Sequence, residues 1–277
     1  MKTERRCHPR LLLAPLALAL PLACAPAAAP PPAEDAATAG ATEVSFESAD
    51  GVRVFADHHV HSSGPSAPLI LLFHQAGGDA RGEYGPIVPR LLESGYQALA
   101  VDQRAGGERF GGVNRTMAAR DSAESGYCDA YPDLVAALDW AIAEGLNGPR
   151  FAWGSSYSAA LVLKLAAERG ADLSGVLAFS PASGEPMRGC EPADFAQEIR
   201  IPVLALRPPD EAQNERVRAQ LEAFGALGFG TYVAVHGTHG SSMLVAERAD
   251  GDVEPTWMVV LEFLRKTAAE PPAPVGK

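Results

Sequence analysis

Short apolar runs that alternate with helical stretches constrain the fold of this chain more than any other feature. The runs at residues 69–73 (LILLF), 98–102 (ALAVD) and 176–180 (VLAFS) are almost continuously apolar, which is typical of strands buried on both faces of a sheet. We expect further strands at 44–46, 52–60, 150–153, 203–206 and 231–235, and helices at 83–94, 131–144, 158–169, 211–227 and 256–267. This alternation predicts an α/β fold in which helices cover both faces of a mostly parallel central sheet.

The strongest chemical signal follows the expected strand at 150–153, where the chain reads Gly154-Ser155-Ser156-Tyr157-Ser158. The pattern resembles the G-x-S-x-G elbow, in which a serine lies on a tight turn between a strand and a helix. Such a turn crowds the positions two before and two after the serine, and both are small here. We predict Ser156 as the nucleophile. Ser155 precedes the apex of the turn and is the weaker candidate, and the alternative is a serine-rich helix cap.

Two later strand ends supply candidate partners for this serine, and ligands bind at this edge of a parallel sheet. His239 lies in the loop after the strand at 231–235, and we predict it as the general base. His236 lies nearer the strand end and is interpreted as structural. Asp210 follows the strand at 203–206, and we predict it as the acid that orients the imidazole. Glu211 is its nearest competitor, and Asp210 could instead cap the following helix.

The loop at residues 73–78 (FHQAGG) directly follows the first buried strand. Its two glycines let the backbone approach a ligand closely. We predict that the backbone N–H groups of Ala76 and Tyr157 bind an oxyanion, with Gln75 as the alternative to Ala76. His74 is expected to hold this loop by hydrogen bonds rather than to react.

Three segments together resemble the dienelactone-hydrolase-like branch of the α/β hydrolases, namely residues 69–112, GSSYSA at 154–159 and HGTHGSSML at 236–244. The resemblance covers roughly residues 44–266. It implies the α/β-hydrolase fold, a Ser/Asp/His triad, no cofactor, and hydrolysis of a small-molecule ester or lactone. True dienelactone hydrolases commonly use a cysteine nucleophile, whereas this chain has serine, and Gln75 replaces a common glycine. The alternative function is a non-catalytic, lipid-anchored binding module on a hydrolase fold.

The N-terminal segment predicts export. Four basic residues precede a short apolar run at 11–22, as in a secretory signal at residues 1–23. Cys24 follows a small residue and resembles a bacterial lipidation site, the alternatives being cleavage without lipidation and an uncleaved anchor. We expect a disordered Ala/Pro-rich tether at 24–42, a hydrolase domain at 43–268 and a disordered tail at 269–277. The expected location is the bacterial cell envelope, lipid-anchored, or otherwise periplasmic or secreted.

Charge narrows the classes of partner. Loss of residues 1–23 would remove four basic residues and one acidic residue, which changes the net charge from −11 to −14. Such a charge repels nucleic acid and anionic lipid, so we expect membrane contact only through the lipid anchor. A histidine-rich run at 57–61 (DHHVH) invites a metal interpretation, but it lacks further ligands and we predict no metal site. The sequence leaves the oligomeric state open.

Two cysteines remain once the signal and Cys24 are set aside. Cys128 precedes the helix at 131–144, and Cys190 follows the strand at 176–180. Both positions lie toward the edge of the sheet where we expect the active site, and export would place them in an oxidising compartment. We predict a disulfide across the mouth of the site. The alternative is two thiols that pack separately.

Overall fold

The computed structural model describes residues 40–120 and 125–269. Several predictions fall outside these residues and are not tested by them: the signal at 1–23, the lipidation candidate Cys24, the tether up to residue 39 and the tail from residue 270 onward.

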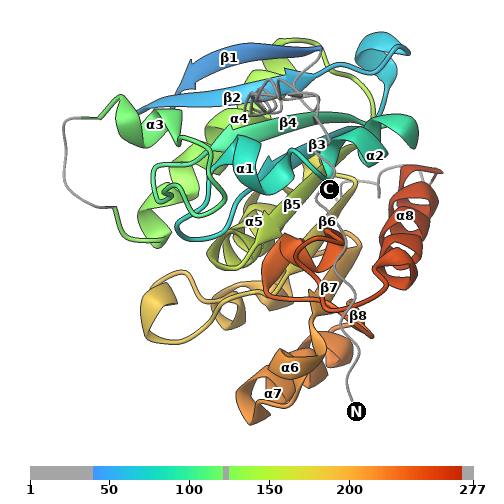
Figure 1. Ribbon diagram of the computed structural model, residues 1–277. Coiled ribbons are helices and arrows are strands. Elements are labelled where there is room, and N and C mark those ends of the chain that lie inside the picture. The colour runs from blue at the N-terminus through green and yellow to red at the C-terminus, as the bar shows by residue number, and fades with distance from the viewer. Residues whose placement is uncertain (1–39, 121–124, 270–277) are drawn as a thin grey trace, which may run out of the picture. The chain divides into compact units, whose positions relative to one another are not determined.

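An eight-stranded sheet forms the centre of the described domain (Figure 1). Its strands are β1 (Ala41–Glu47), β2 (Arg53–His59), β3 (Leu69–Phe73), β4 (Gln97–Asp102), β5 (Arg150–Ser155), β6 (Gly175–Phe179), β7 (Val203–Arg207) and β8 (Gly230–Val233), in the order β1-β2-β4-β3-β5-β6-β7-β8. Strand β2 runs antiparallel to β1 and β4, and all pairs from β4 to β8 are parallel. The predicted mostly parallel sheet is confirmed, although β1 begins before residue 43, the expected domain start.

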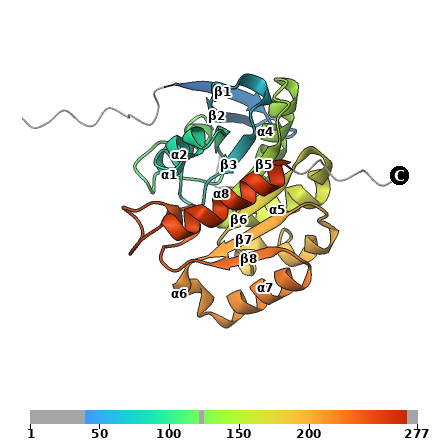
Figure 2. The ribbon, with the colours of Figure 1, turned by 90° about the vertical axis from the view of Figure 1, so that its right-hand side faces the viewer.

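Helices cover both faces of the sheet, as predicted. The chain forms α1 (Ala80–Tyr84), α2 (Val88–Glu93), α3 (Arg115–Ala118), α4 (Tyr131–Ala143), α5 (Tyr157–Arg169), α6 (Pro209–Ala212), α7 (Glu215–Ala226) and α8 (Glu254–Ala269). Buried side chains of α4 and α5 pack on one face, and those of α1, α2 and α8 pack on the other. Figure 2 shows α8 lying across the parallel strands.

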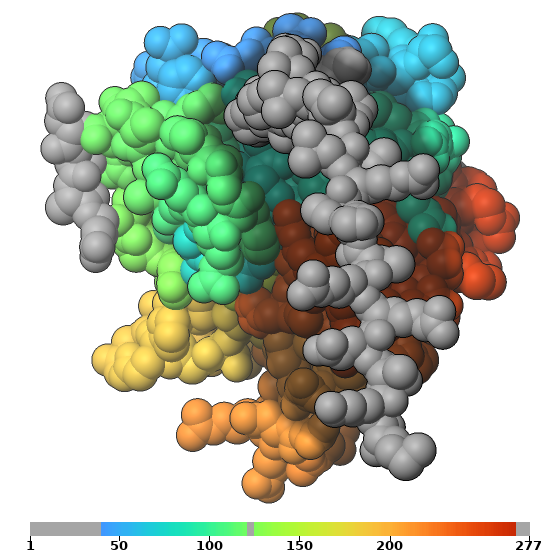
Figure 3. Space-filling view, viewed as in Figure 1, coloured from blue at the N-terminus to red at the C-terminus, as the bar shows by residue number. Residues whose placement is uncertain are grey.

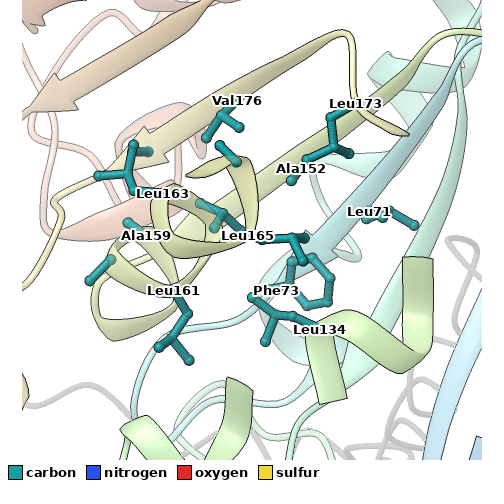
Figure 4. Packing of buried hydrophobic residues seen from close by; sticks show 14 of the residues in the cluster. Leu71, Phe73, Leu134, Ala152, Ala159, Leu161, Leu163, Leu165, Leu173 and Val176 are labelled. Carbon is teal, nitrogen blue, oxygen red and sulfur yellow. The ribbon is translucent and has the colours of Figure 1, made fainter. Parts of the chain in front are cut away.

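The alternation of side chains along β3 connects these two layers. Leu71 and Phe73 join the cluster under α4 and α5, whereas Ile70 and Leu72 face the opposite cluster, and all four are fully buried. In Figure 4, Phe73 lies close to Leu134 of α4, among the leucines of α5. Close packing on both faces makes the strand ends a rigid platform for the loops that follow them.

Two helices expected from the sequence are each divided in the structure. The stretch 83–94 is divided between the separate helices α1 and α2, because Pro86 has no backbone N–H to donate to the Gly82 carbonyl oxygen, which accepts from Arg248 instead. The stretch 211–227 forms α6 and α7. Asn214 begins α7 as its N-cap, with its side chain accepting a hydrogen bond from the Arg216 N–H.

Candidate active site

The predicted elbow is present between β5 and α5. Ser156 has φ 61° and ψ −116°, in the left-handed half of conformational space that residues with a side chain rarely adopt. A Cβ atom at Gly154 would lie 2.3 Å from the Ser158 carbonyl oxygen, so only glycine fits that position. This strained turn presents Ser156 at the N-terminus of α5, as a nucleophile elbow requires.

Backbone and side-chain hydrogen bonds hold the elbow in place. The Ser156 N–H donates to the Phe179 carbonyl at 2.8 Å, and its carbonyl accepts from the Ala182 N–H at 3.1 Å. The Ser158 hydroxyl donates to the His74 carbonyl at 2.6 Å. The strained turn is therefore tied both to the end of β6 and to the loop after β3, which stabilises its unfavourable backbone geometry.

The loop that carries His239 docks directly on the elbow. The Ser241 N–H donates to the buried Ser155 hydroxyl at 3.0 Å. Gly240 has φ +68°, and a Cβ atom there would lie 2.3 Å from the Ser155 Oγ, so the two loops meet at close range. His239 directly precedes Gly240 in the chain, and Ser156 directly follows Ser155. The Ser155 hydroxyl thus holds the histidine loop against the elbow, which agrees with the prediction that Ser155 is the weaker candidate for the nucleophile.

The structure places Glu211, the competitor, and not Asp210 against His239. The Nδ1 of His239 lies 2.5 Å from Oε1 of Glu211, whereas Asp210 is exposed to solvent. Both acids lie in the four-residue helix α6, where successive side chains point about 100° apart because a turn takes 3.6 residues. Only one of the two can therefore face His239, and the orientation of α6 selects Glu211.

The charge of Glu211 is well defined. Burial alone would raise the pKa of its carboxyl group, but hydrogen bonds from His239 and Arg207 outweigh burial and lower that pKa to about 2. Glu211 is therefore an anion at neutral pH. An anion that contacts Nδ1 favours a proton on that nitrogen and leaves Nε2 free to accept one.

The two backbone donors considered in the loop after β3 differ, since the Gln75 N–H is occupied and the Ala76 N–H is free. The Gln75 N–H donates to Oε2 of Glu83 at 2.8 Å, which removes Gln75 as an oxyanion donor. The backbone N–H groups of Ala76 and Tyr157 form no hydrogen bond with any described residue. Both N–H groups are thus unoccupied, as donors to an oxyanion must be.

His74 supports this loop, as predicted. Its Nδ1 lies 2.9 Å from the Gln75 carbonyl oxygen, and its Nε2 accepts from the Gln103 N–H at 3.0 Å. The two contacts require a neutral ring with its proton on Nδ1. Complete burial lowers the pKa of His74, which is consistent with that neutral form. A histidine with both nitrogens occupied has no free atom for chemistry.

Sequence reasoning missed Glu83. This side chain is fully buried, and its Oε1 has no hydrogen-bond partner among the described residues. Burial raises the pKa of Glu83 to about 7, against smaller opposing effects of the Ser155 hydroxyl and the Gln75 N–H. No pattern in the sequence marks it, because a glutamate in a helix is ordinarily exposed.

A cavity of about 450 Å³ is lined in part by the loop after β3. Its lining includes Gly77, which follows Ala76, and Tyr127, whose ring stacks on Tyr157 with centroids 4.8 Å apart. Arg104 also lines it, but Asp133, Asp50 and Ser48 already accept hydrogen bonds from its guanidinium. The cavity therefore offers no unpaired charge from that arginine.

The two cysteines form the predicted disulfide. The Cα atoms of Cys128 and Cys190 are 5.8 Å apart, and the bond joins the segment before α4 to the segment after β6. In Figure 3, these segments (green and yellow) lie next to each other on the surface. Tyr127 and Pro186, which both line the cavity, flank this link. The disulfide thus joins the two segments that contribute Tyr127 and Pro186 to the cavity wall.

The remaining candidates have structural roles. His58 bonds Gln97, and Asp57 pairs with Arg81 and Arg115. His236 lies 3.9 Å from Asp250 at the surface. Within residues 40–120 and 125–269, no cluster of side chains could hold a metal ion, and no helix there is long and apolar enough to cross a membrane.

Solved structures share this fold at low sequence identity. An esterase of Pyrococcus furiosus superposes with a TM-score of 0.62 at 16% identity, over 83% of this chain and 91% of its own. Est1E from Butyrivibrio proteoclasticus gives 0.60 at 16%, over 84% and 100%. A dienelactone hydrolase from Anabaena variabilis gives 0.59 at 15%, over 82% and 98%. No family model and no curated protein matches the sequence. The predicted α/β-hydrolase fold is confirmed.

Proposed function

We propose that this protein is a serine hydrolase that cleaves carboxylic esters or lactones through an acyl-enzyme. Ser156 is the nucleophile, His239 the general base and Glu211 the acid. The observation that carries the proposal is the 2.5 Å contact between Glu211 and His239, in a loop docked on the elbow that presents Ser156. An esterase and a dienelactone hydrolase with the same fold support this class of reaction.

In the first half-reaction, the Ser156 hydroxyl attacks the substrate carbonyl carbon while Nε2 of His239 accepts its proton. The Ala76 and Tyr157 N–H groups stabilise the negative oxygen that forms. A preorganised donor of this kind contributes roughly 3–4 kcal/mol to stabilisation of the transition state. The protonated imidazole, held by the Glu211 anion, then gives its proton to the departing alkoxide, and the acyl group remains on Ser156.

Water completes the cycle. His239 accepts a proton from a water molecule, which attacks the acyl-enzyme carbonyl, and the same two N–H groups stabilise the second oxyanion. Collapse of this intermediate returns the proton to Ser156 and releases the carboxylic acid. With a lactone, the alcohol and the acid leave as one molecule.

The cavity lined by Gly77 and Tyr127 suits the acyl part of the substrate. Its volume of about 450 Å³ lies in the range of small-molecule sites. The Arg104 charge is satisfied within the protein, so the cavity favours an uncharged group. Est1E, a protein of this fold, has been solved with ferulic acid bound.

A panel of esters and lactones tests the proposal, with Ser156→Ala as the matched control. We expect hydrolysis by the wild type and loss of nearly all activity in Ser156→Ala, together with labelling of the wild type alone by a fluorophosphonate probe. Equal rates for the two proteins would contradict the assignment. Absence of both turnover and labelling would favour the alternative, a binding module on a hydrolase fold.

We also propose that the protein acts in the cell envelope, with Cys24 as its lipid anchor. The basic and apolar segments before Cys24 support this location. Replacement Cys24→Ser should move the protein from the membrane fraction to the soluble fraction. Recovery of the wild type in the soluble fraction would show that no anchor is attached.

A further inference from the structure

Arg207, the last residue of β7, is a buried cation beside the candidate triad. Its side chain is only 6% exposed, and its Nη1 donates to Oε2 of Glu211 at 2.7 Å. Its Nη2 donates to the Pro181 carbonyl oxygen and, at 2.5 Å, to Oε1 of Gln220. Arginine is seldom buried this deeply unless its charge is paired, and here the paired anion is the triad acid.

The carboxylate of Glu211 is held from two sides. Oε2 accepts from Arg207, whereas Oε1 contacts Nδ1 of His239 and accepts from the Ser180 hydroxyl at 3.2 Å. The Ser180 hydroxyl in turn accepts from the Gly240 N–H at 3.0 Å. Helix α6 has only four residues and cannot fix a side chain by itself. The contacts with Arg207 and the Ser180 hydroxyl therefore hold Glu211 where it meets the imidazole, and Arg207 is the charged one of the two.

The charge of Arg207 also acts on the base. An anion that already pairs with arginine stabilises an imidazolium less than an unpaired anion would. A charged His239 lowers the pKa of Glu83 of α1, so Glu83 is a second carboxyl group whose charge acts on this histidine. Arg248 lowers the Glu83 pKa in the same way and contacts the backbone of α1. Among these groups, Arg207 alone contacts the triad acid.

We propose that Arg207 is a positioning residue that fixes Glu211 against His239 and sets the lower end of the pH range in which the base works. This inference rests on the proposed function, since it assigns a role within that triad. Arg207 itself touches no reacting atom.

The dependence of kcat/KM on pH tests the inference in the full-length protein. In Arg207→Gln, the acidic limb should move to higher pH by about 0.5–1 unit, since an arginine in direct contact shifts an acid by about 1–3 units and this one acts through the carboxylate. We expect kcat to fall about tenfold with KM nearly unchanged, as for an interaction that matters in the transition state. Arg207→Lys keeps the charge, so its acidic limb should stay in place while kcat falls.

Arg115→Gln is the matched control, because it also removes a mostly buried arginine, 13% exposed, from carboxylate partners, Asp102 and Asp57, away from the proposed triad. It should lower stability without moving the acidic limb. If Arg207→Gln fails to fold, Arg207→Met provides a second neutral variant with an apolar side chain for the buried site. An unmoved limb in a folded neutral variant, with activity lowered equally at every pH, would reduce Arg207 to a structural role.

An NMR titration of the His239 ring separates this inference from the proposed function. Spectra are recorded in the Ser156→Ala background, with His239→Asn to assign the signal. The pH midpoint of the His239 titration should be higher in Arg207→Gln than in the protein with Arg207, and an unchanged midpoint would overturn the inference. If the wild type cleaves no ester but the midpoint rises, the proposed function fails and the role of Arg207 in holding the acid–histidine pair stands.

Discussion

The two halves of the candidate active site are held by different forces. The elbow and the loop after β3 are fixed mainly by the backbone, through the positive φ of Ser156, the close approach at Gly154 and buried hydrogen bonds. The acid and the histidine are fixed by charge, through Arg207, Glu211 and the imidazole. The backbone half therefore depends on pH only where Glu83 accepts from the Gln75 N–H, whereas the charged half depends throughout on which groups carry protons.

Neutralising the acid should break the charged half and give the largest effect. In Glu211→Gln, an amide cannot stabilise the imidazolium, so we expect kcat/KM to fall by about 10³–10⁴-fold. Asp210→Asn, one residue away and exposed, should stay within about twofold of the wild type. Steady-state kinetics on one activated ester compare the two variants. A larger loss in Asp210→Asn would return the role of acid to that residue.

Removing the disulfide should affect the cavity wall and leave both halves of the site unchanged. By the chain-entropy estimate, the paired replacement Cys128→Ser/Cys190→Ser lowers the free energy of unfolding by about 4 kcal/mol. Turnover of a small acetyl ester should change little, because neither cysteine contacts the triad. Urea unfolding and kinetics on short and bulky esters measure the two effects. Equal losses for both esters would show that the link supports the triad itself.

Glu83 lies where the two halves meet, and its titration should appear in stability. Its pKa is raised to about 7 in the folded state, so the stability associated with its protonated form is present below about pH 4.5. That stability is lost as pH rises through about 7, by up to about 3 kcal/mol. The free energy of unfolding of Glu83→Gln, measured relative to that of the wild type, should therefore increase from pH 5 to pH 8. Urea unfolding at both pH values measures this gain, and a constant difference would contradict it.

A substitution at the contact between the halves should have a smaller effect on activity. Gly240→Ala places a Cβ atom against the Ser155 Oγ and strains a positive φ, so the histidine loop must move. A displacement of about 1 Å lowers kcat/KM by about 10²-fold. Gly228→Ala is the control, because φ there is +83° but no atom lies within 4 Å of the new Cβ. It should lose stability and keep its activity; equal loss of activity in both would point to strain alone.

The same contrast explains what could be predicted from the sequence. The buried strands follow from continuous apolar runs, and Ser156 follows from small residues at fixed spacing, because both signals are local. The choice between Asp210 and Glu211 depends on the rotation of α6 against the rest of the protein, which no local pattern encodes. The burial of Glu83 depends on how its helix packs against the elbow, so the sequence alone did not predict it. The division at Gly85-Pro86, in contrast, has a local cause in the sequence. The prediction of a single helix at 83–94 did not take that proline into account and was wrong.

Whether the bond between Cys128 and Cys190 forms also depends on where in the cell the chain folds. The cysteines are 62 positions apart, and α4, β5, α5 and β6 all lie between them. The link can therefore form only after those elements have been synthesised and an oxidant is present. Protein made in a reducing compartment would contain every residue of the proposed triad but lack the link between the two segments of the cavity wall. Two samples of the same sequence would then differ in the covalent structure of that wall.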